Sequence, residues 1–266
     1  MAPSARGSAM RHTVVVARLA LLQMARSRPL LAYVLALGAI VAALSLFGGD
    51  PAKVSLTLAS LLLLIVPLIT LVLIALQQYN NREFVELLLA QPISRRAVYW
   101  GQWTGMTLAL VGGCTLPLVA GYFVWGNYDV ALLTIAGVVL TLCFSALAYR
   151  LAIGQPDKAR GIGLALMVWL YCAVLYDAIL VVAMAILEDY PIEKALLVLL
   201  ALNPIDAIRV ALLLHSDASA LMGITGAALR GFFGSERSLV VIALVVTGWI
   251  GYPLLRGERI FRRRDF

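Results

Sequence analysis

One acidic residue lies deep within a long apolar stretch of the chain. Asp177 falls about 21 Å along a helix predicted over residues 162–187, at a rise of about 1.5 Å per residue. A charge in hydrocarbon is costly, so we expect this carboxylate to face a bundle interior or water. The helical repeat places Asp177, Met184 and Glu188 on one face, in a stripe that opens toward the outside. The stripe predicts a translocation path or a gate; a packing role for a protonated or hydrogen-bonded aspartate fits it as well.

Three cysteines lie at comparable depth in three consecutive predicted helices: Cys114, Cys143 and Cys172. Thiolates are soft ligands that suit Cu(I), so a three-cysteine metal site is one interpretation. Small apolar cysteines are also common in protein cores, and the sequence favours that packing role. Because all three lie within helices, they do not form the disulfide framework of a small secreted domain.

Several catalytic motifs are missing from the sequence. It contains no G-x-x-x-x-G-K-[S/T], so we expect no ATP hydrolysis through a P-loop of its own. H-E-x-x-H, C-x-x-C and G-x-S-x-G are also missing, and His12 and His215 are predicted on opposite sides of the membrane. These observations predict a protein that is not an enzyme and carries no cofactor. Nothing in the chain resembles a nucleic-acid-binding module.

The elements that carry these residues are set by composition. Of 266 residues, 62% are hydrophobic and 13% charged, and the mean hydropathy is +0.95, which is typical of a membrane protein. A hydrocarbon core of about 30 Å takes roughly 20 apolar residues per helix. The long runs lack period-two alternation, which excludes a barrel. The predicted fold is therefore all-α, with transmembrane helices at 30–47, 54–76, 102–125, 130–153, 162–187 and 238–256.

The basic residues predict the orientation. Sixteen of the 21 lysines and arginines lie near four segments that would share one side of the membrane: 1–28, 77–101, 150–160 and 256–266. The positive-inside rule places that side, with both termini, in the cytoplasm. The net charge of +7 then reflects orientation and attraction to lipid headgroups.

The segment before the first span predicts an interfacial helix. Residues 1–9 are expected to be flexible, and residues 10–28 place Arg11 and Arg18 on one face with apolar side chains on the others. Pro29 would mark the bend into the first span. We interpret 10–28 as an amphipathic elbow helix, a merely frayed basic N-terminus being the alternative. Residues 29–256 would form one transmembrane domain, and 257–266 a basic cytoplasmic tail.

The predicted cytoplasmic segment 81–96 has a pattern of its own. A short apolar turn stops at Pro92, and Ser94 is a suitable N-cap for the next helix. This pattern predicts a helix, a break and a second helix that project from the membrane. An ordinary charged loop between spans remains the alternative.

Residues 188–237 form the one sizeable segment expected on the outer side. Residues 195–202 are too short to span, and Asn203-Pro204 breaks the chain before a second short helix over 205–214. We expect these short outer helices to dip into the outer leaflet or to cap the bundle. A Gly/Ala-rich piece over 219–233 is a candidate lid.

These features together resemble the ABC-2-type permease family. The resemblance rests on six spans, a basic elbow, a terminal F-R-R-R-D and a cytoplasmic E-x-x-x-L-L-x-x-P-x-S-R element. It implies a membrane subunit that pairs with a separate ATPase, which binds ATP and Mg, through a coupling helix over 83–96. The residues implied at that contact are Glu83, Phe84, Glu86, Leu87, Leu88, Pro92, Ser94, Arg95 and Arg96. Family members often carry Glu-x-Gly-Thr and Gly-Lys where this chain has Glu83-Phe84-Val85 and Gly101-Gln102. Individual contacts at the ATPase interface are therefore not carried over from the family in detail.

Within that family, the chain is most similar to permeases that serve the copper sites of nitrous-oxide reductase, through short pieces such as Leu202-Asn203-Pro204-Ile205-Asp206. This resemblance implies a homodimer bound to two ATPase subunits and handling of a sulfur or copper species. It also implies a β-helical periplasmic partner, which we expect to dock near Asn203, Pro204, Asp206, Arg209 and Met222.

Other functions stay open at this point. An ABC-2 exporter of a lipid, a polysaccharide precursor or a peptide would share the same elements. A membrane scaffold that needs no ATPase, or a secondary transporter, belongs to another class. Against an ion-coupled carrier, only Asp177 lies deep in a span, and the sequence shows no inverted repeat of broken helices. A neighbouring ATPase reading frame would favour the ABC interpretation.

Overall fold

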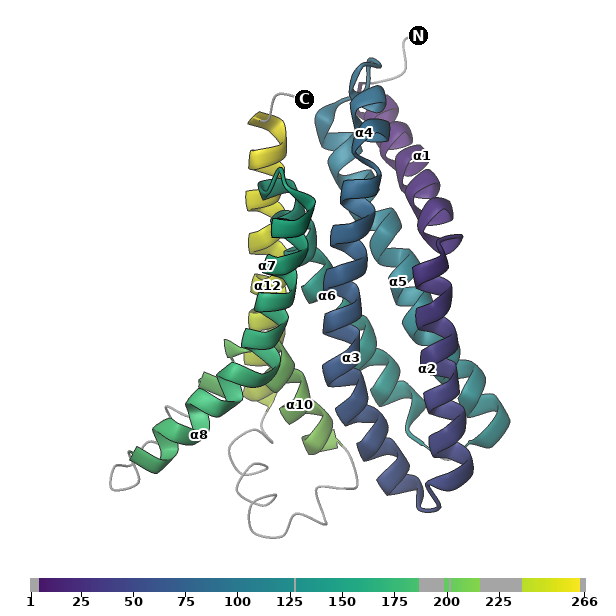
Figure 1. The fold of residues 1–266 in the computed structure, drawn as a ribbon, viewed down its shortest axis with the longest axis vertical. Coiled ribbons are helices and arrows are strands. Elements are labelled where there is room, and N and C mark those ends of the chain that lie inside the picture. Colours follow the sequence, from purple (N-terminus) through teal and green to yellow (C-terminus); the bar gives the residue numbers. More distant parts are fainter. Residues whose placement is uncertain (1–4, 127, 187–198, 201, 216–235, 264–266) are drawn as a thin grey trace.

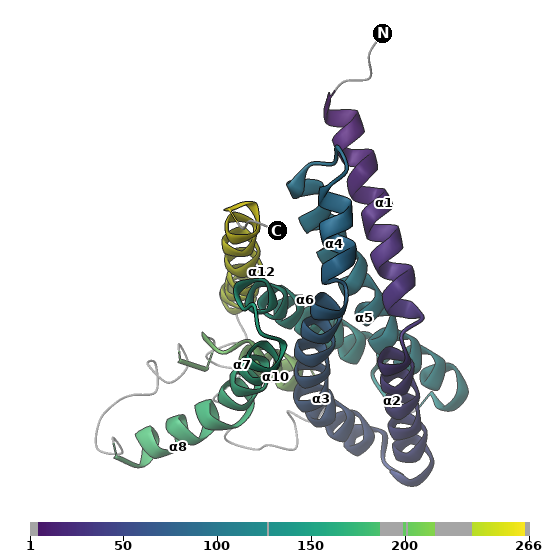
Figure 2. The ribbon, with the colours of Figure 1, turned by 45° about the horizontal axis from the view of Figure 1, so that its top comes forward.

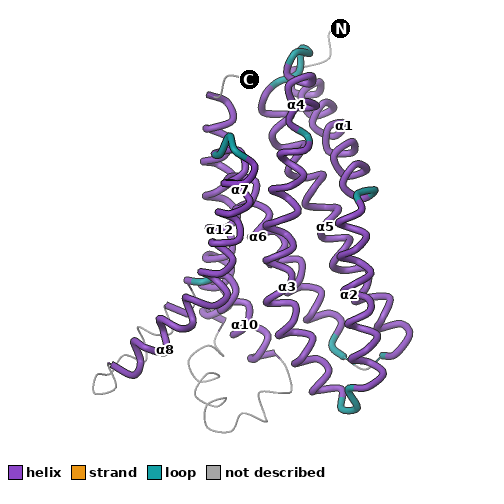
Figure 3. The backbone as a smooth tube through the Cα atoms, in the orientation of Figure 1, coloured by secondary structure: helices purple, strands orange, loops and turns teal. Residues whose placement is uncertain are grey.

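The computed structural model describes residues 5–126, 128–186, 199–200, 202–215 and 236–263. Figure 3 shows helices and connecting loops over these residues and no strand among them. The predicted all-α fold is therefore confirmed for the described part of the chain. Both chain ends lie at the same end of the molecule in Figure 1.

Five helical stretches are long and apolar enough to cross a membrane. Four are single helices: α2 (Arg28–Phe47), α3 (Pro51–Asn80), α5 (Arg95–Trp125) and α6 (Val130–Gly154). The fifth, over Lys158–Ile186, consists of α7 (Lys158–Leu170), the π-helix η1 (Tyr171–Leu175) and α8 (Tyr176–Ile186). The predicted sixth span coincides with α12 (Glu236–Arg263), whose crossing of the membrane stays a prediction.

Polar side chains fix where these helices begin. An aspartate at position 50, 129 or 157 accepts a hydrogen bond from a backbone N–H in the first turn of α3, α6 or α7. Ser27 does the same for α2. The three aspartates also place negative charge at the positive end of each helix dipole. The apolar helices are thus separated by short turns with their own capping groups.

Helix α6 lies at the centre of the bundle, between α3, α5 and α12. Helices α1 (Ala5–Ala25) and α2 cover α5, and α7 packs on α3. Among the candidate spans, α3 has the largest buried share at 61%, and the α7–α8 stretch has the smallest at 17%. The bundle core therefore lies around α3 and α6, and the α7–α8 stretch lies at its edge.

Helix α1 bends away from α2 at the Ser27–Pro29 turn, which Figure 2 shows most clearly. The helix begins at Ala5 and so takes in part of the segment 1–9 for which the sequence predicted flexibility. Arg11 and Arg18 are exposed, while Val16 and Met24 are buried against the bundle. A bent, basic, two-sided helix is what the elbow prediction requires, and its position in a membrane interface stays a prediction.

Two glycines allow α1 to approach α5 closely. A Cβ on Gly105 would clash with the carbonyl oxygen of Ala17, and one on Gly101 would lie 2.9 Å from the carbonyl oxygen of Thr13. Glycines four residues apart on one face let helix backbones come together, because no side chain separates them. The contact between the elbow and the third span therefore depends on these two positions.

The fifth span differs from the single helix that the sequence predicted over 162–187. A π turn at Tyr171–Leu175 interrupts it, and α8 then diverges from the other helices (Figures 1 and 2). A π-helix widens the backbone ring by one residue and shifts the following turn relative to the preceding one. The residues after it, including Asp177, consequently turn toward a different neighbour, the helix α10 (Pro204–His215).

Candidate functional site

The predicted cytoplasmic element folds as a short helix, a break and a second helix. Helix α4 (Arg82–Leu89) ends before Pro92, and α5 starts at Arg95. The Ser94 hydroxyl accepts a hydrogen bond from the Ala97 backbone N–H at 3.2 Å, which confirms the predicted N-cap. The presence of α4 agrees with the resemblance, whereas contact with an ATPase is a separate question of function.

Helix α4 has two distinct faces. Val85 and Leu88 are buried against the bundle, with Leu88 8% exposed. Leu87, by contrast, is 68% exposed and lies next to the exposed carboxylates of Glu83 and Glu86. An apolar side chain flanked by two acids therefore projects from the end of the molecule. The remaining predicted contact residues are half-buried Phe84 and exposed Pro92, Ser94, Arg95 and Arg96.

The junction between α3 and α4 is held by polar contacts from other segments. Asn81 is 4% exposed, and its Oδ1 accepts hydrogen bonds from Gln23 Nε2 of α1 at 2.6 Å and from Gln77 Nε2 at 3.3 Å. The turn between α6 and α7 adds two more contacts. There, Arg82 Nη1 donates to the Pro156 carbonyl at 2.9 Å, and Lys158 Nζ donates to Asn80 Oδ1 at 3.0 Å.

The start of α5 is bonded to the end of α12. Glu258 Oε1 lies 3.0 Å from Arg96 Nε, and Glu258 Oε2 accepts a hydrogen bond from Trp100 Nε1 at 3.1 Å. Tyr99 donates its hydroxyl proton to the Leu254 carbonyl at 2.8 Å. Sequence reasoning missed Glu258, although an acid between Arg256 and Arg259 in the basic C-terminal segment was a usable signal.

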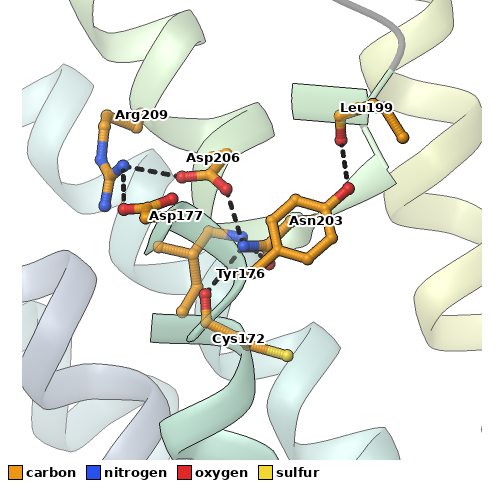
Figure 4. A network of polar contacts seen from close by, with 8 residues as sticks. Cys172, Tyr176, Asp177, Leu199, Asn203, Asp206 and Arg209 are labelled. Carbon is orange, nitrogen blue, oxygen red and sulfur yellow. Dashed lines mark hydrogen bonds and ion pairs between the residues drawn. The ribbon is translucent and has the colours of Figure 1, made fainter. Parts of the chain in front are cut away.

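A second polar cluster lies at the other end of the molecule, where η1, α8 and α10 meet (Figure 4). Arg209 Nη1 lies 2.8 Å from Asp177 Oδ2 and 2.7 Å from Asp206 Oδ1. Asn203 Nδ2 donates to Asp206 Oδ2 at 2.7 Å and to the Cys172 carbonyl at 2.8 Å. We call Asp177, Asn203, Asp206 and Arg209 the outer network.

The electrostatics of the outer network are uneven. The Asp206 side chain has no exposed surface, whereas those of Asp177 and Arg209 are 34% and 38% exposed. Burial raises the pKa of the Asp206 carboxyl to about 6; the Asp177 charge also raises it, and the Arg209 guanidinium opposes both. One arginine therefore balances two carboxylates, and one of the two is removed from water.

The described structure contains two of the three predicted path residues, Asp177 and Met184, both on α8. Asp177 is paired with Arg209, so the partner that a charge within an apolar span requires is present. Met184 is 46% exposed on α8, and Glu188 lies outside the described residues. The predicted stripe of three is thus reduced to Asp177 and Met184 in the described structure.

The predicted outer docking residues are mostly internal. Asn203, Pro204 and Asp206 are buried, and Asn203 holds the start of α10 against η1 through the Cys172 carbonyl. Only Arg209 among the described members has exposed surface, and Met222 lies outside the described residues. Three of the five residues consequently offer no surface to a partner in this conformation, because they serve the contact between two helices.

The three cysteines do not form a common site. All are buried free thiols, and Cys114 and Cys143 contact different neighbours, Gly137 and the Val246 carbonyl. The described residues contain no group of three or more His, Cys, Asp or Glu side chains that could hold a metal ion. The three-cysteine copper interpretation is therefore wrong, and the packing role is the one the structure supports.

Comparison with known proteins agrees with this architecture. The family model of the ABC-2 family transporter proteins matches residues 80–266, from the end of α3 onward. A probable ABC transporter permease protein NosY from Stutzerimonas stutzeri is 30% identical over 239 residues, covering 82% of each chain. Its counterpart from Pseudomonas aeruginosa is 29% identical over 234 residues, again covering 82% of each. The chain therefore belongs to the ABC-2 family of transporter proteins, as a permease subunit of an ABC transporter.

Proposed function

We propose that this permease subunit couples ATP hydrolysis by a separate ATPase to export or signalling across the bacterial inner membrane. The observation that carries the proposal is the exposed face of α4, with Leu87 between Glu83 and Glu86. A partner can move the bundle through this helix only if the helix is firmly seated. Its buried face and the contacts around Asn81 supply that seat.

The proposed topology has six spans with both termini in the cytoplasm. The four basic segments meet at one end of the described structure, where α1, the α3–α4 junction, the α6–α7 turn and the end of α12 are joined by side-chain contacts. An ATPase that supplies ATP and Mg would dock at this end. With α12 as the sixth span, this end is the cytoplasmic one by the positive-inside rule.

The proposed assembly is a homodimer of this chain bound to two ATPase subunits. A single subunit presents one coupling element. Because a pair of ATPase subunits that closes around nucleotide would bind two coupling elements, two copies of this chain are required. The apolar α7–α8 stretch, the least buried of the candidate spans, leaves apolar surface for lipid or for a second subunit.

The proposed cargo class follows from the relatives. Both curated relatives carry the name NosY, so we propose that the chain serves assembly of the copper sites of nitrous-oxide reductase, by moving a sulfur or copper species. A periplasmic NosD-like protein would receive the cargo on the outer side. An ABC-2 exporter of a lipid, polysaccharide or peptide is the alternative cargo class.

A binding experiment tests the coupling assignment. The Leu87→Asp variant places a charge in the proposed contact and leaves the buried face of α4 intact, so membrane insertion should be unchanged. We expect capture of the partner ATPase to fall at least about tenfold, as for a residue at the centre of an interface. The measurement is co-purification in detergent, together with ATP hydrolysis.

Phe47→Asp is the matched control. Phe47 is 87% exposed at the opposite end of the molecule, so the same change in chemistry should leave ATPase capture unaltered. If Leu87→Asp retains full capture and normal hydrolysis, α4 is not the coupling helix. If the wild-type chain captures no ATPase at all, the scaffold or secondary-transporter alternatives gain support.

A further inference from the structure

The first two turns of α5, which directly follow the cytoplasmic element, are bonded to α12 at regular intervals. Leu254, Glu258 and Arg262 follow each other at four-residue spacing, so they lie along one face of α12. Leu254 accepts from Tyr99, Glu258 contacts Arg96 and Trp100, and the Arg262 carbonyl accepts from Arg95 Nη1 at 3.0 Å. Three successive turns of α12 are therefore bonded to the first two turns of α5.

Glu258 is the central member of this contact. It is 6% exposed, and both of its carboxylate oxygens are used, one by Arg96 and one by Trp100. A buried carboxylate with two donors has a fixed geometry, because moving either helix would leave a charge without its partners. Displacement of the cytoplasmic element should therefore displace α12 with it.

The other part of α12 reaches the outer network. Trp249 Nε1 donates to the Leu202 carbonyl at 2.9 Å, and Leu202 directly precedes Asn203. Asn203 in turn holds the Cys172 carbonyl in the π turn of the fifth span. Trp249 and Glu258 are separated by about 14 Å along the helix axis, at about 1.5 Å per residue.

A proline lies between the two contact points. Pro253 lacks the backbone N–H that would bond to the Trp249 carbonyl, so the helix can bend at this turn. Movement of the cytoplasmic part about this point would pull or release the Leu202 carbonyl. Helix α12 thus has a contact with the start of α5 at Glu258, a bending point at Pro253 and a contact with Leu202 at Trp249. We call the first the input contact and the last the output contact.

We propose that α12 transmits movement of the cytoplasmic element to the outer network, with Glu258 as its input positioning residue and Trp249 as its output positioning residue. This inference rests on the proposed function, since the movement is supplied by ATP binding at the partner. Neither residue touches cargo or nucleotide; both act through the residues they hold.

A fluorescence experiment in the assembled complex tests the transmission. A cysteine placed at Val181, which is 65% exposed on α8, would carry an environment-sensitive fluorophore, and the three native cysteines are buried. In the wild-type background, ATP should change the emission of this label. Glu258→Ala and Trp249→Phe should each reduce that change at least about fivefold, the lower end of a typical coupling between sites. Capture of the ATPase should persist in both variants.

Two controls separate transmission from a general loss of structure. Trp169 Nε1 donates to the Leu64 carbonyl of α3, so Trp169→Phe removes the same kind of bond outside the proposed route and should leave the response unchanged. Glu258→Gln keeps a side chain of the same size whose amide oxygen can still accept from Trp100 Nε1, so this variant should retain more of the response than Glu258→Ala. A general loss of structure would lower capture of the ATPase as well as the fluorescence response.

The outcomes distinguish this inference from the proposed function. A wild-type complex that responds to ATP, with variants that respond equally well, would overturn the role of α12 and leave the coupling helix in place. A wild-type complex that forms but shows no response to ATP at Val181 would also overturn the inference, because no movement reaches α8. A chain that captures no ATPase would instead count against the proposed function itself.

Discussion

At the scale of single residues, the buried carboxyl of Asp206 gives the outer network a measurable pH dependence. The pKa of this group is about 6 in the folded protein, against an ordinary value of 3.8. Because the folded value is the higher one, the folded state binds this proton more strongly than the unfolded state does. The resulting stabilisation is complete below about pH 3.8 and is lost as the pH rises through about 6.

The first prediction compares the wild type with Asp206→Asn, which has a similar shape and does not titrate. Between pH 4.5 and 7.5, the wild type should lose about 2 kcal/mol of unfolding free energy relative to the variant, taking about 1.4 kcal/mol per pKa unit. Thermal unfolding in detergent at a series of pH values measures the difference. Parallel pH profiles for the two proteins would show that Asp206 does not titrate in this range.

Local sequence patterns identified some residues of the outer network, whereas the contacts between its helices could not be predicted from such patterns. Asp177 stood out because a charge in an apolar run needs a partner, and Arg209 is that partner. The pairing itself crosses from α8 to α10, and no local pattern encodes it. Asp206 and Asn203 were expected on a docking surface because the resemblance implies an outer partner, yet tertiary packing buries both.

At the scale of elements, the contact between α1 and α5 depends on the absence of side chains. Gly105 is the position where an added Cβ would meet backbone atoms of Ala17 and Leu21 as well as the Ala20 side chain. Backbone cannot move aside as the end of a flexible side chain can. The two helices must therefore separate if this glycine is replaced.

The second prediction is that Gly105→Ala destabilises the protein by about 1–3 kcal/mol, as overpacking of a close contact does. It should also expose α1 to limited proteolysis. Gly112 lies on the same helix with no atom within 4 Å of an added Cβ, so Gly112→Ala is the matched control and should be neutral or slightly stabilising. Equal stability of the two variants would mean that α1 packs on α5 differently from the structure described.

Elements were predictable where the signal is local. The capping residue Ser94, the stop before Pro92 and the long apolar helices all appear in the sequence and in the structure. The π turn at Tyr171–Leu175 was not predictable, because it depends on Asn203, more than thirty residues later, which donates to the Cys172 carbonyl. The four-residue spacing of Gly101 and Gly105 is visible in the sequence and permits a close helix approach, but it does not identify α1 as the partner.

At the scale of the whole molecule, the proposed transmission needs both ends of α12 to lie where the topology places them. Glu83 and Arg259 are exposed at the end that carries the four basic segments. Lys53 is exposed in the first turn of α3, at the opposite end of the bundle. The three positions therefore report the side of each end independently, provided that the buried native thiols do not react.

The third prediction is that a membrane-impermeant thiol reagent labels Lys53→Cys in intact spheroplasts and labels Glu83→Cys and Arg259→Cys only after permeabilisation. The physical reason is that the arginines near the last two positions resist transfer across the membrane against its potential. Labelling of Arg259→Cys in intact spheroplasts, with Glu83→Cys still protected, would mean that α12 does not cross as proposed. Because Glu258 of α12 contacts Arg96 and Trp100 beside α4, that result would contradict the structure as well as the topology. Labelling of Glu83→Cys in intact spheroplasts would place α4 outside the cell, away from any source of ATP, and would remove the physical basis for coupling to a cytoplasmic ATPase.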